Sequence, residues 1–405
     1  MSFDRSHFGL PTISGATRPG TLYRAWTAVR ETGPLVYMED WGMVLTARHD
    51  IVSGVLRDDR FGRDGTGVGA RDPHAELTPD WNRYVRGSFM ELDPPAHSRV
   101  RRTVSQAFSV RRISRLEPGL REKARTALDG ATGTLDLVSG YATPIALGAI
   151  SELLDLPQDC HESVVSWSHD IVRLFEPSTG TDVAVQAERA TGQFAALVED
   201  LVRARRSNPR DDLLSALAAG GAADLTDIEI IATVILLLNA GHEATVHAIT
   251  NAIRLIIEHP DAFKTIERQM EMEGTIDDRA IAELLRFEPP LQLFHRWTLR
   301  EVELAGTPLP PGVKVGLALG GANRDPRRFA DPETIDLHRS DNPHLSFGSG
   351  VHRCIGASLA SLELRIAIEE FVRATTARAI ELTDAGAWID SVVFRGRTGL
   401  SVTLR

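Results

Sequence analysis

The feature that most restricts how this chain folds is a helical pattern that runs from Thr226 to His259 in its second half. Thr226 and Glu229 have the spacing of a capping box, which predicts that the helix begins here. The pattern is much longer than an average helix, and its first half is apolar almost all round. Because a helix that is apolar on every side has to be buried, we expect a long helix inside the core.

The same stretch resembles a membrane span only superficially. Its most apolar part, Ile228 to Leu238, is interrupted by Glu229 and followed by Asn239 and His242, so it is too short to cross a bilayer. With 405 residues, of which 42% are hydrophobic and 25% charged, the composition is that of a globular protein with a substantial core. No linker-like run separates independent cores, so we expect a single domain over residues 1–405.

The cysteines and the net charge indicate the cellular compartment and the class of partner. Cys160 and Cys354 lie far apart and form no spacing pattern, which favours a reducing cytosol over a disulfide scaffold. The N-terminal residues lack the apolar core of a signal peptide, so we expect a cytoplasmic protein without a membrane partner. A net charge of -10 argues against nucleic acid as a main partner.

A glycine-punctuated loop, residues 347–356, places Cys354 just before a second helical pattern. Gly348, Gly350 and Gly356 can adopt positive φ, which lets the backbone curl around a bulky group. Apolar residues recur at helical spacing from position 357 onward, so Cys354 is expected near a helix N-terminus. That end of the helix dipole lowers the pKa of a thiol, which favours the thiolate form.

A thiolate here has several potential roles. Zinc and iron–sulfur sites need several Cys or His at close spacing, and none flank Cys354. A Cys354–His352 nucleophile is another option, although residues two apart seldom face each other productively. An inert buried cysteine and the axial ligand of a haem complete the alternatives.

The residues of this loop, with Phe347, the glycines, a basic residue, the cysteine and Gly356 in order, resemble the haem-binding loop of the cytochrome P450 monooxygenases. The resemblance implies haem b with Cys354 as the axial ligand of its iron, and Phe347, Gly348, His352 and Gly356 around it. It extends from about Leu22 to Leu404. It implies the family's fold, which is mostly α with a small β portion.

The long helix carries polar residues where an apolar core is expected, which is costly unless they are satisfied or used. His242 and Glu243 open a zinc-protease pattern, but the position of its second histidine is Val246, so we reject zinc. Glu243 is then either a hydrogen-bonded core acid or a proton relay.

The segment from Ala240 also resembles the family's oxygen-activation motif. That resemblance implies Ala240 and Gly241 beside the haem and Glu243 as the proton relay. The family's usual threonine falls on Ala244, and Thr245 points about 100° away on a helix. Either water and a substrate hydroxyl complete the relay, or a local distortion brings Thr245 to it.

Three further motifs match the family in order. His97 and Arg101 share a helix face, and they form either a solvated basic face or a haem propionate site. Arg296 is either an exposed strand arginine or the second propionate ligand. The resemblance also implies a structural network of Glu283, Arg286 and Arg339, which locks the core near the cysteine loop.

The resemblance also suggests which residues line the distal pocket. A stripe at four-residue spacing ends at Phe175, and most such stripes are simply core. The other members come from the long helix, from the residues just before Arg296 and from a predicted short strand, Val392–Phe394, with Asn239 and Gln292 as polar anchors. The full set is Phe175, Leu236, Asn239, Gln292, Leu293, Phe294, Val393 and Phe394.

The function implied is insertion of one oxygen atom from O2 into a small or medium hydrophobic substrate, aromatic compounds included, by hydroxylation or oxidative O-dealkylation. Since the chain carries neither flavin nor iron–sulfur motifs, electrons are expected from NAD(P)H through a ferredoxin reductase and a ferredoxin. The ferredoxin is expected to dock on basic residues such as Arg102 and Arg112, with the protein a monomer. A peroxide-driven peroxygenase, a non-catalytic haem-binding protein and a haem-free hydrolase remain the alternatives.

Overall fold

The computed structural model describes residues 21–404, apart from positions 71–72, 109, 130, 132, 220–224, 377 and 379. The chain divides into two compact units, and each is built from separate stretches of sequence. Unit 1 contains the described residues up to Phe61, Glu117–Ile145 and the residues from Ala244 onward, whereas unit 2 contains Gly62–Leu116 and Ala146–Glu243. The expectation of one domain over residues 1–405 stays a prediction.

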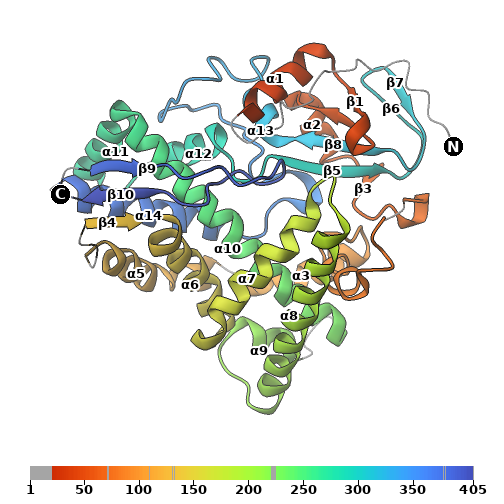
Figure 1. Ribbon diagram of the computed structural model, residues 1–405, viewed down its shortest axis with the longest axis horizontal. Coiled ribbons are helices and arrows are strands. Elements are labelled where there is room, and N and C mark those ends of the chain that lie inside the picture. The colour runs from red at the N-terminus through yellow and green to blue at the C-terminus, as the bar shows by residue number, and fades with distance from the viewer. Residues whose placement is uncertain are drawn as a thin grey trace. The chain divides into compact units, whose positions relative to one another are not determined.

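Unit 1 is organised around a five-stranded sheet with the order β1-β2-β8-β5-β3 (Figure 1). β1 (Val36–Met38) pairs antiparallel with β2 (Met43–Thr46) to form a hairpin. β8 (Lys314–Ala318) runs parallel to β2 and antiparallel to β5 (Leu293–Thr298). β3 (Phe61–Gly62) completes the order at the far edge.

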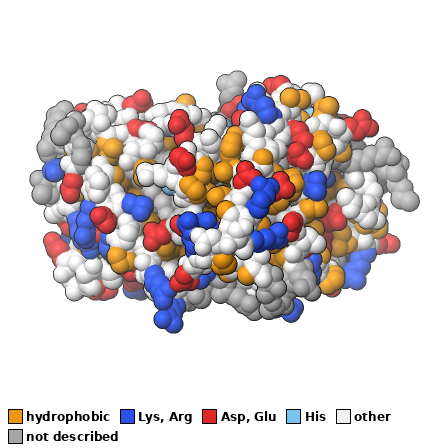
Figure 2. Space-filling model, turned by 90° about the horizontal axis from the view of Figure 1, so that it is seen from below, with side chains coloured by type: hydrophobic (Ala, Val, Ile, Leu, Met, Phe, Trp, Pro, Cys, Tyr) orange, Lys and Arg blue, Asp and Glu red, His pale blue; other side chains and the backbone are white. Residues whose placement is uncertain are grey.

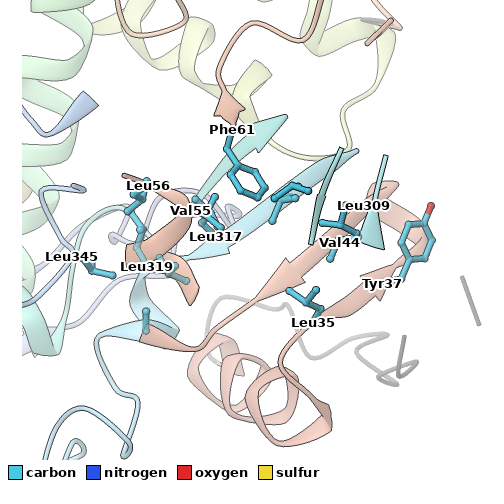
Figure 3. Packing of buried hydrophobic residues seen from close by; sticks show 14 residues of the cluster. Leu35, Tyr37, Val44, Val55, Leu56, Phe61, Leu309, Leu317, Leu319 and Leu345 are labelled. Atoms are coloured by element: carbon cyan, nitrogen blue, oxygen red, sulfur yellow. The ribbon is translucent and has the colours of Figure 1, made fainter. Parts of the chain in front are cut away.

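A cluster of buried apolar side chains packs on this sheet (Figure 3). Val44, Val315 and Leu317 come from its strands, and each is fully buried. Leu345 belongs to the same cluster and lies two residues before Phe347. The cysteine loop therefore starts from a point anchored in the core of unit 1.

Helices and two smaller sheets complete unit 1. α14 (Ala357–Thr376) lies alongside α5 (Glu117–Asp129) (Figure 1). β10 is the central strand of the order β4-β10-β9, and β6 pairs with β7. The remaining bounds are α1 Leu22–Thr32, α2 His49–Val55, α11 Pro260–Glu273, α12 Asp278–Phe287, α13 Leu319–Ala322, β4 Gly133–Asp136, β6 Val302–Leu304, β7 Thr307–Leu309, β9 Ile380–Asp384 and β10 Ser401–Leu404.

Unit 2 is helical. α7 (His161–Val172) and α8 (Thr181–Ser207) run side by side (Figure 1). Trp167 of α7 packs against Phe194 of α8, with ring centroids 5.5 Å apart. The other helices are α3 Ala96–Ala107, α4 Val110–Ser114 and α9 Leu213–Ala218, and α6 Thr143–Leu154 begins in unit 1 and continues into unit 2.

The long helix is confirmed as α10, Asp227–Glu258. Its capping box is also confirmed, because Thr226 N donates to Glu229 Oε2 (2.9 Å) and Glu229 N donates to Thr226 Oγ1 (3.3 Å). Within the described residues, α10 alone is long and apolar enough to resemble a membrane span, and 67% of that apolar window is buried. It is a core helix, and the whole is mostly α with a small β portion, as expected.

The strand predicted over Val392–Phe394 is wrong. Phe394 forms only an isolated bridge with Leu291. The cause is a local turn, since Ser391 Oγ accepts hydrogen bonds from Val393 N (3.2 Å) and Phe394 N (2.7 Å). A serine that competes in this way for backbone donors interrupts a ladder.

The capping box offers a test of what starts α10. Replacing Thr226 by alanine is expected to lower the free energy of unfolding by about 1 kcal/mol, because it removes the acceptor for Glu229 N. Thr265→Ala is the control, since that hydroxyl donates to the Asp261 carbonyl within α11 and caps no backbone amide. Equal changes in denaturant unfolding of the two variants would contradict this role.

Candidate functional site

The cysteine loop has a defined shape. Gly348 N donates to Leu345 O (2.8 Å), and Cys354 N donates to Phe347 O (2.9 Å), which closes the loop at its base. A short 3₁₀ turn, Gly350–His352, precedes the cysteine, and α14 begins three residues after it. The Cys354 side chain is exposed and lies near the N-terminal end of α14, as expected.

Two of the loop's glycines are required by geometry. Gly348 and Gly350 have φ of 64° and 71°, a region that side-chain-bearing residues rarely adopt. A Cβ at Gly350 would also overlap the carbonyl oxygen of Leu56, just past α2. Gly356 differs from our expectation, because its φ is not positive and a Cβ there would lie 4.0 Å from Cys354 Sγ, an ordinary contact distance.

A buried ion pair supports this region of unit 1. Glu283 and Arg286 of α12 are both fully buried and joined by two hydrogen bonds of 2.7 Å. Arg339 Nε donates to Glu283 Oε2 (3.0 Å), so the structure brings all three residues of the expected network together. Arg286 also donates hydrogen bonds to backbone carbonyl oxygens. Its Nη1 donates to those of Asn323 and Pro332, and its Nη2 donates to that of Thr334.

Sequence reasoning missed the link from this network to the loop. The carbonyl of Asn323 is held by Arg286, its Oδ1 accepts from Leu345 N (2.7 Å), and its Nδ2 donates to Ser346 Oγ (2.9 Å). Ser346 in turn donates to Leu285 O in α12 (2.8 Å). Because nothing in the sequence around Asn323 marks it as polar core, only the structure could find it.

His344 was also missed, although it stands three residues before Phe347. Burial, together with the nearby Arg286 and Arg353, lowers its pKa to about 4 against the opposing effect of Glu283, so the ring is neutral at physiological pH. Its ring lies 5.8 Å from that of Phe347. His344 therefore acts as a packing residue at the start of the loop.

The motif on α10 contains an open position within a buried stretch. The residues from Ile231 to Asn239 are buried, whereas Ala240 is exposed and Gly241 is half-buried. A Cβ at Gly241 would lie 3.1 Å from Cγ1 of Ile150 in α6. The glycine therefore lets α6 and α10 approach closely, which is a packing reason that the sequence did not reveal.

Glu243 has an imidazole on each side. His169 Nδ1 of α7 lies 3.6 Å from Glu243 Oε1, and His242 Nε2 lies 3.5 Å from Glu243 Oε2. Asn239, one turn earlier, accepts a hydrogen bond of 2.6 Å from Ser168 Oγ. Its carbonyl oxygen is therefore already engaged.

α10 is α-helical from Asp227 to Glu258 without a π-type bulge, and the Thr245 side chain is buried within it. Ala244, at the position of the family's usual threonine, is half-buried. Which group completes the relay stays a prediction.

The residues expected to bind the propionates are less exposed than solvated surface residues would be. In unit 2, His97 is 1% exposed and lies beside the ring of Phe89, while Arg101, one turn further along α3, is half-buried. In unit 1, Arg296 is 3% exposed in β5, where its Nη1 donates to His295 O (2.9 Å). His97 and Arg296 are therefore not surface residues.

Two predicted pocket residues serve the fold instead. Gln292 is fully buried, its Oε1 accepts from Trp26 Nε1 (3.1 Å), and its Nε2 donates to Pro289 O (2.8 Å) and Tyr23 OH (3.2 Å). Because its amide is fully engaged, we withdraw it as a substrate anchor. Leu293 packs into the cluster that surrounds Trp26.

The other predicted pocket residues differ in exposure. Phe175 is half-buried, with its ring 5.7 Å from that of Trp81. Phe294 and Phe394 are half-buried, and Leu236, Asn239 and Val393 are buried. The half-buried aromatic rings are the members with surface left for a ligand.

The ligands available for a metal restrict which cofactor fits Cys354. Within the described part of the chain, no group of three or more His, Cys, Asp or Glu side chains could hold a metal ion. A single thiol at the tip of a fixed loop suits an iron whose other ligands come from a macrocycle. The residues present therefore fit a haem.

Comparison with known proteins identifies the family. The cytochrome P450 family model matches residues 169–384, which is more than half of the chain. PikC, a cytochrome P450 monooxygenase of Streptomyces venezuelae, is 32% identical over 370 residues, 89% of this chain and 85% of that protein. Vitamin D(3) 25-hydroxylase of Pseudonocardia autotrophica is 32% identical over 392 residues, 94% and 93% of the two chains.

Solved structures agree with the family model. P450BioI, crystallised with an acyl carrier protein carrying hexadec-9Z-enoic acid, has a TM-score of 0.88 at 27% identity, covering 96% of this chain and 99% of that one. Myxobacterial CYP267B1, in complex with myristic acid, has a TM-score of 0.87 at 30% identity, covering 97% and 100%. The chain belongs to the cytochrome P450 family and is a P450 monooxygenase.

The buried ion pair in α12 is expected to be essential for stability. Replacing Arg286 by leucine leaves a buried carboxylate without its main partner, which costs about 3–5 kcal/mol of unfolding free energy. The matched control is Arg203→Leu, which breaks another i,i+3 pair, Asp200–Arg203, whose side chains are 71% and 70% exposed. Denaturant unfolding should show little change in that control, and a similar loss in both variants would contradict our interpretation.

Gly350 and Gly348 form a second matched pair. Alanine at Gly348 costs about 1–2 kcal/mol, because of its positive φ alone, since nothing lies within 4 Å of the added Cβ. Alanine at Gly350 adds the overlap with Leu56 O, so we expect a distinctly larger loss of thermal stability and of bound cofactor. Equal melting temperatures for the two variants would show that the loop is not held against this carbonyl.

Proposed function

We propose that this P450 monooxygenase binds haem b through the Cys354 thiolate. The observation that carries the proposal is the exposed thiol, presented by a loop that glycine conformation and the network around Asn323 hold in place. The dipole of α14 favours the thiolate form. Phe347, Gly348, His352 and Gly356 belong to the same loop and are proposed to surround the haem.

His97, Arg101 and Arg296 are proposed to bind the haem propionates. His97 and Arg101 share one face of α3, and Arg296 is buried in β5. Cationic side chains form strong charge-assisted hydrogen bonds with carboxylates, so the chemistry of these residues suits a propionate. Their role is to hold and orient the cofactor.

When bound and reduced by two electrons, the haem would supply the chemistry that inserts one atom of O2 into a substrate C–H bond and releases the other atom as water. The chain has to provide two protons for that water. Glu243 is the proposed proton donor into the pocket. Because Ala244 has no hydroxyl, a water or a substrate hydroxyl is proposed to stand between Glu243 and the reacting oxygen.

The substrate is proposed to be a small or medium hydrophobic compound, aromatic compounds included, that undergoes hydroxylation or oxidative O-dealkylation. Support comes from the half-buried rings of Phe175, Phe294 and Phe394. Relatives are named as hydroxylases of 6-deoxyerythronolide B and of vitamin D3, and one matching structure contains myristic acid. All three compounds are largely apolar.

Electrons are proposed to come from NAD(P)H through a ferredoxin reductase and a ferredoxin, to a monomeric cytoplasmic enzyme. The expected docking residues differ in availability, because Arg102 is exposed whereas Arg112 Nη2 is paired with Asp211 (3.1 Å). On the face that Figure 2 shows, basic and acidic side chains are interspersed, without one dominant patch. The ferredoxin surface is therefore proposed to depend on a few arginines, with Arg102 foremost.

The haem-ligand proposal is tested by the absorption spectrum of the reduced protein under carbon monoxide. Wild type is expected to show the strongly red-shifted Soret band of a haem thiolate, and Cys354→Ser is expected to lose it. Cys160→Ser is the matched control, because it removes the other cysteine, which is half-buried in unit 2. A colourless wild-type protein, or a band that survives in Cys354→Ser, would refute the proposal.

A further inference from the structure

Glu243 lies between two histidines that together connect solvent with the interior of unit 2. The exposed fraction of the side chain falls from 60% at His169 to 13% at Glu243 and 2% at His242. The contacts of His169 Nδ1 and His242 Nε2 use different oxygens of the same carboxyl group. We call these three residues the His169–Glu243–His242 array.

The tautomer of the His242 ring follows from its contacts. Its Nδ1 lies 2.9 Å from the carbonyl oxygen of Leu238, and because a carbonyl can only accept, Nδ1 carries a proton. Its Nε2 lies 3.5 Å from Glu243 Oε2. Within the described residues this buried nitrogen has no hydrogen-bond partner.

Glu243 is the proposed proton donor into the pocket, so each proton that it gives up has to be replaced before the next turnover. His242 lies on the buried side of the carboxyl group, whereas His169 is the more exposed neighbour. The replacement is therefore expected from the side of His169.

The outer half of the array provides the replacement. Hydrogen bonding to the Glu243 carboxylate raises the pKa of His169 above its ordinary value, against the opposing effects of partial burial and of Arg173. The other charged groups that act on His169 are Asp170 and Arg173, which follow it in the chain. Arg173 also donates a hydrogen bond to Gln186 of α8 (3.0 Å). A histidine with such a pKa can take up and release protons near neutral pH.

The position of His169 is fixed by its neighbour. The buried hydrogen bond between Ser168 Oγ and Asn239 Oδ1 (2.6 Å) joins α7 to α10 one residue before His169. Asn239 and Glu243 are four residues apart, so they share a face of α10. The contact between His169 and Glu243 is thus built into the helix packing of unit 2.

We propose that His169 resupplies Glu243 with protons from solvent, which deepens the proposed function and rests on it. His169 transfers its Nδ1 proton to Glu243 Oε1, which leaves a neutral imidazole and a protonated carboxyl group. The exposed ring then takes a proton from water, while Glu243 releases its own into the pocket. No electron moves in this step.

The first test is an NMR titration of ¹³C-histidine in the ferrous, carbon monoxide-bound protein, with resonances assigned by His169→Gln and His338→Gln. His338 is an exposed histidine of unit 1 and serves as the reference. The His169 midpoint is expected above the ordinary value of a histidine in wild type, and it should fall in Glu243→Gln. A His169 midpoint that ignores Glu243→Gln would overturn the proposal.

The second test separates proton transfer from charge. His169→Gln should lower turnover by about 10²-fold, which is the low end of what a positioned proton donor contributes, and should enlarge the solvent isotope effect. His169→Arg keeps the positive charge but never releases its proton, so it should remain slow. Full recovery in His169→Arg would show that only the charge matters, and wild-type turnover in His169→Gln would exclude any role.

The two proposals fail in different ways. If His169 is not the relay, wild type and all His169 variants keep the red-shifted carbon monoxide spectrum. Only the expected differences in turnover and in the His169 titration are then missing. If haem is not bound through Cys354, that spectrum is missing in wild type as well, which overturns both.

Discussion

The cysteine loop of this protein depends on a buried ion pair. Glu283 and Arg286 have no contact with water, and Arg286 reaches from α12 to the carbonyl of Asn323. Asn323 then holds the backbone at Leu345, where the chain enters the loop that ends at Cys354. A charge pair costs desolvation energy in a core, but once formed it fixes geometry better than apolar contacts, because each donor has one partner. A protein that binds its cofactor through a single ligand has to hold that one thiol rigidly.

The second unit contributes chemistry of another kind. On α10, the polar residues that are unfavourable in an apolar helix are matched by polar residues of α7, through Ser168–Asn239 and His169–Glu243. The first contact is a short buried hydrogen bond that sets the packing of the helices. The second is longer and partly exposed, which suits a site where protons are exchanged rather than held.

The sequence predicted the long helix and its capping box because these follow from local rules of periodicity and capping. It also predicted the network of Glu283, Arg286 and Arg339, through the resemblance rather than through physics. It failed where tertiary contacts decide, as at Asn323, at Gly241 against Ile150, and at Gln292, whose amide is engaged by Trp26, Tyr23 and Pro289. At Val392–Phe394 a hydroxyl two to three residues away replaced the expected strand by a turn.

The central claim is that a single protein sulfur, from Cys354, binds the haem iron. Iron-edge X-ray absorption of the purified protein measures this directly, because sulfur and nitrogen neighbours scatter differently. We expect one sulfur neighbour besides the nitrogens in wild type and in Cys160→Ser, and none in Cys354→Ser. Only nitrogen or oxygen neighbours in wild type, or a sulfur that persists in Cys354→Ser, would contradict the account.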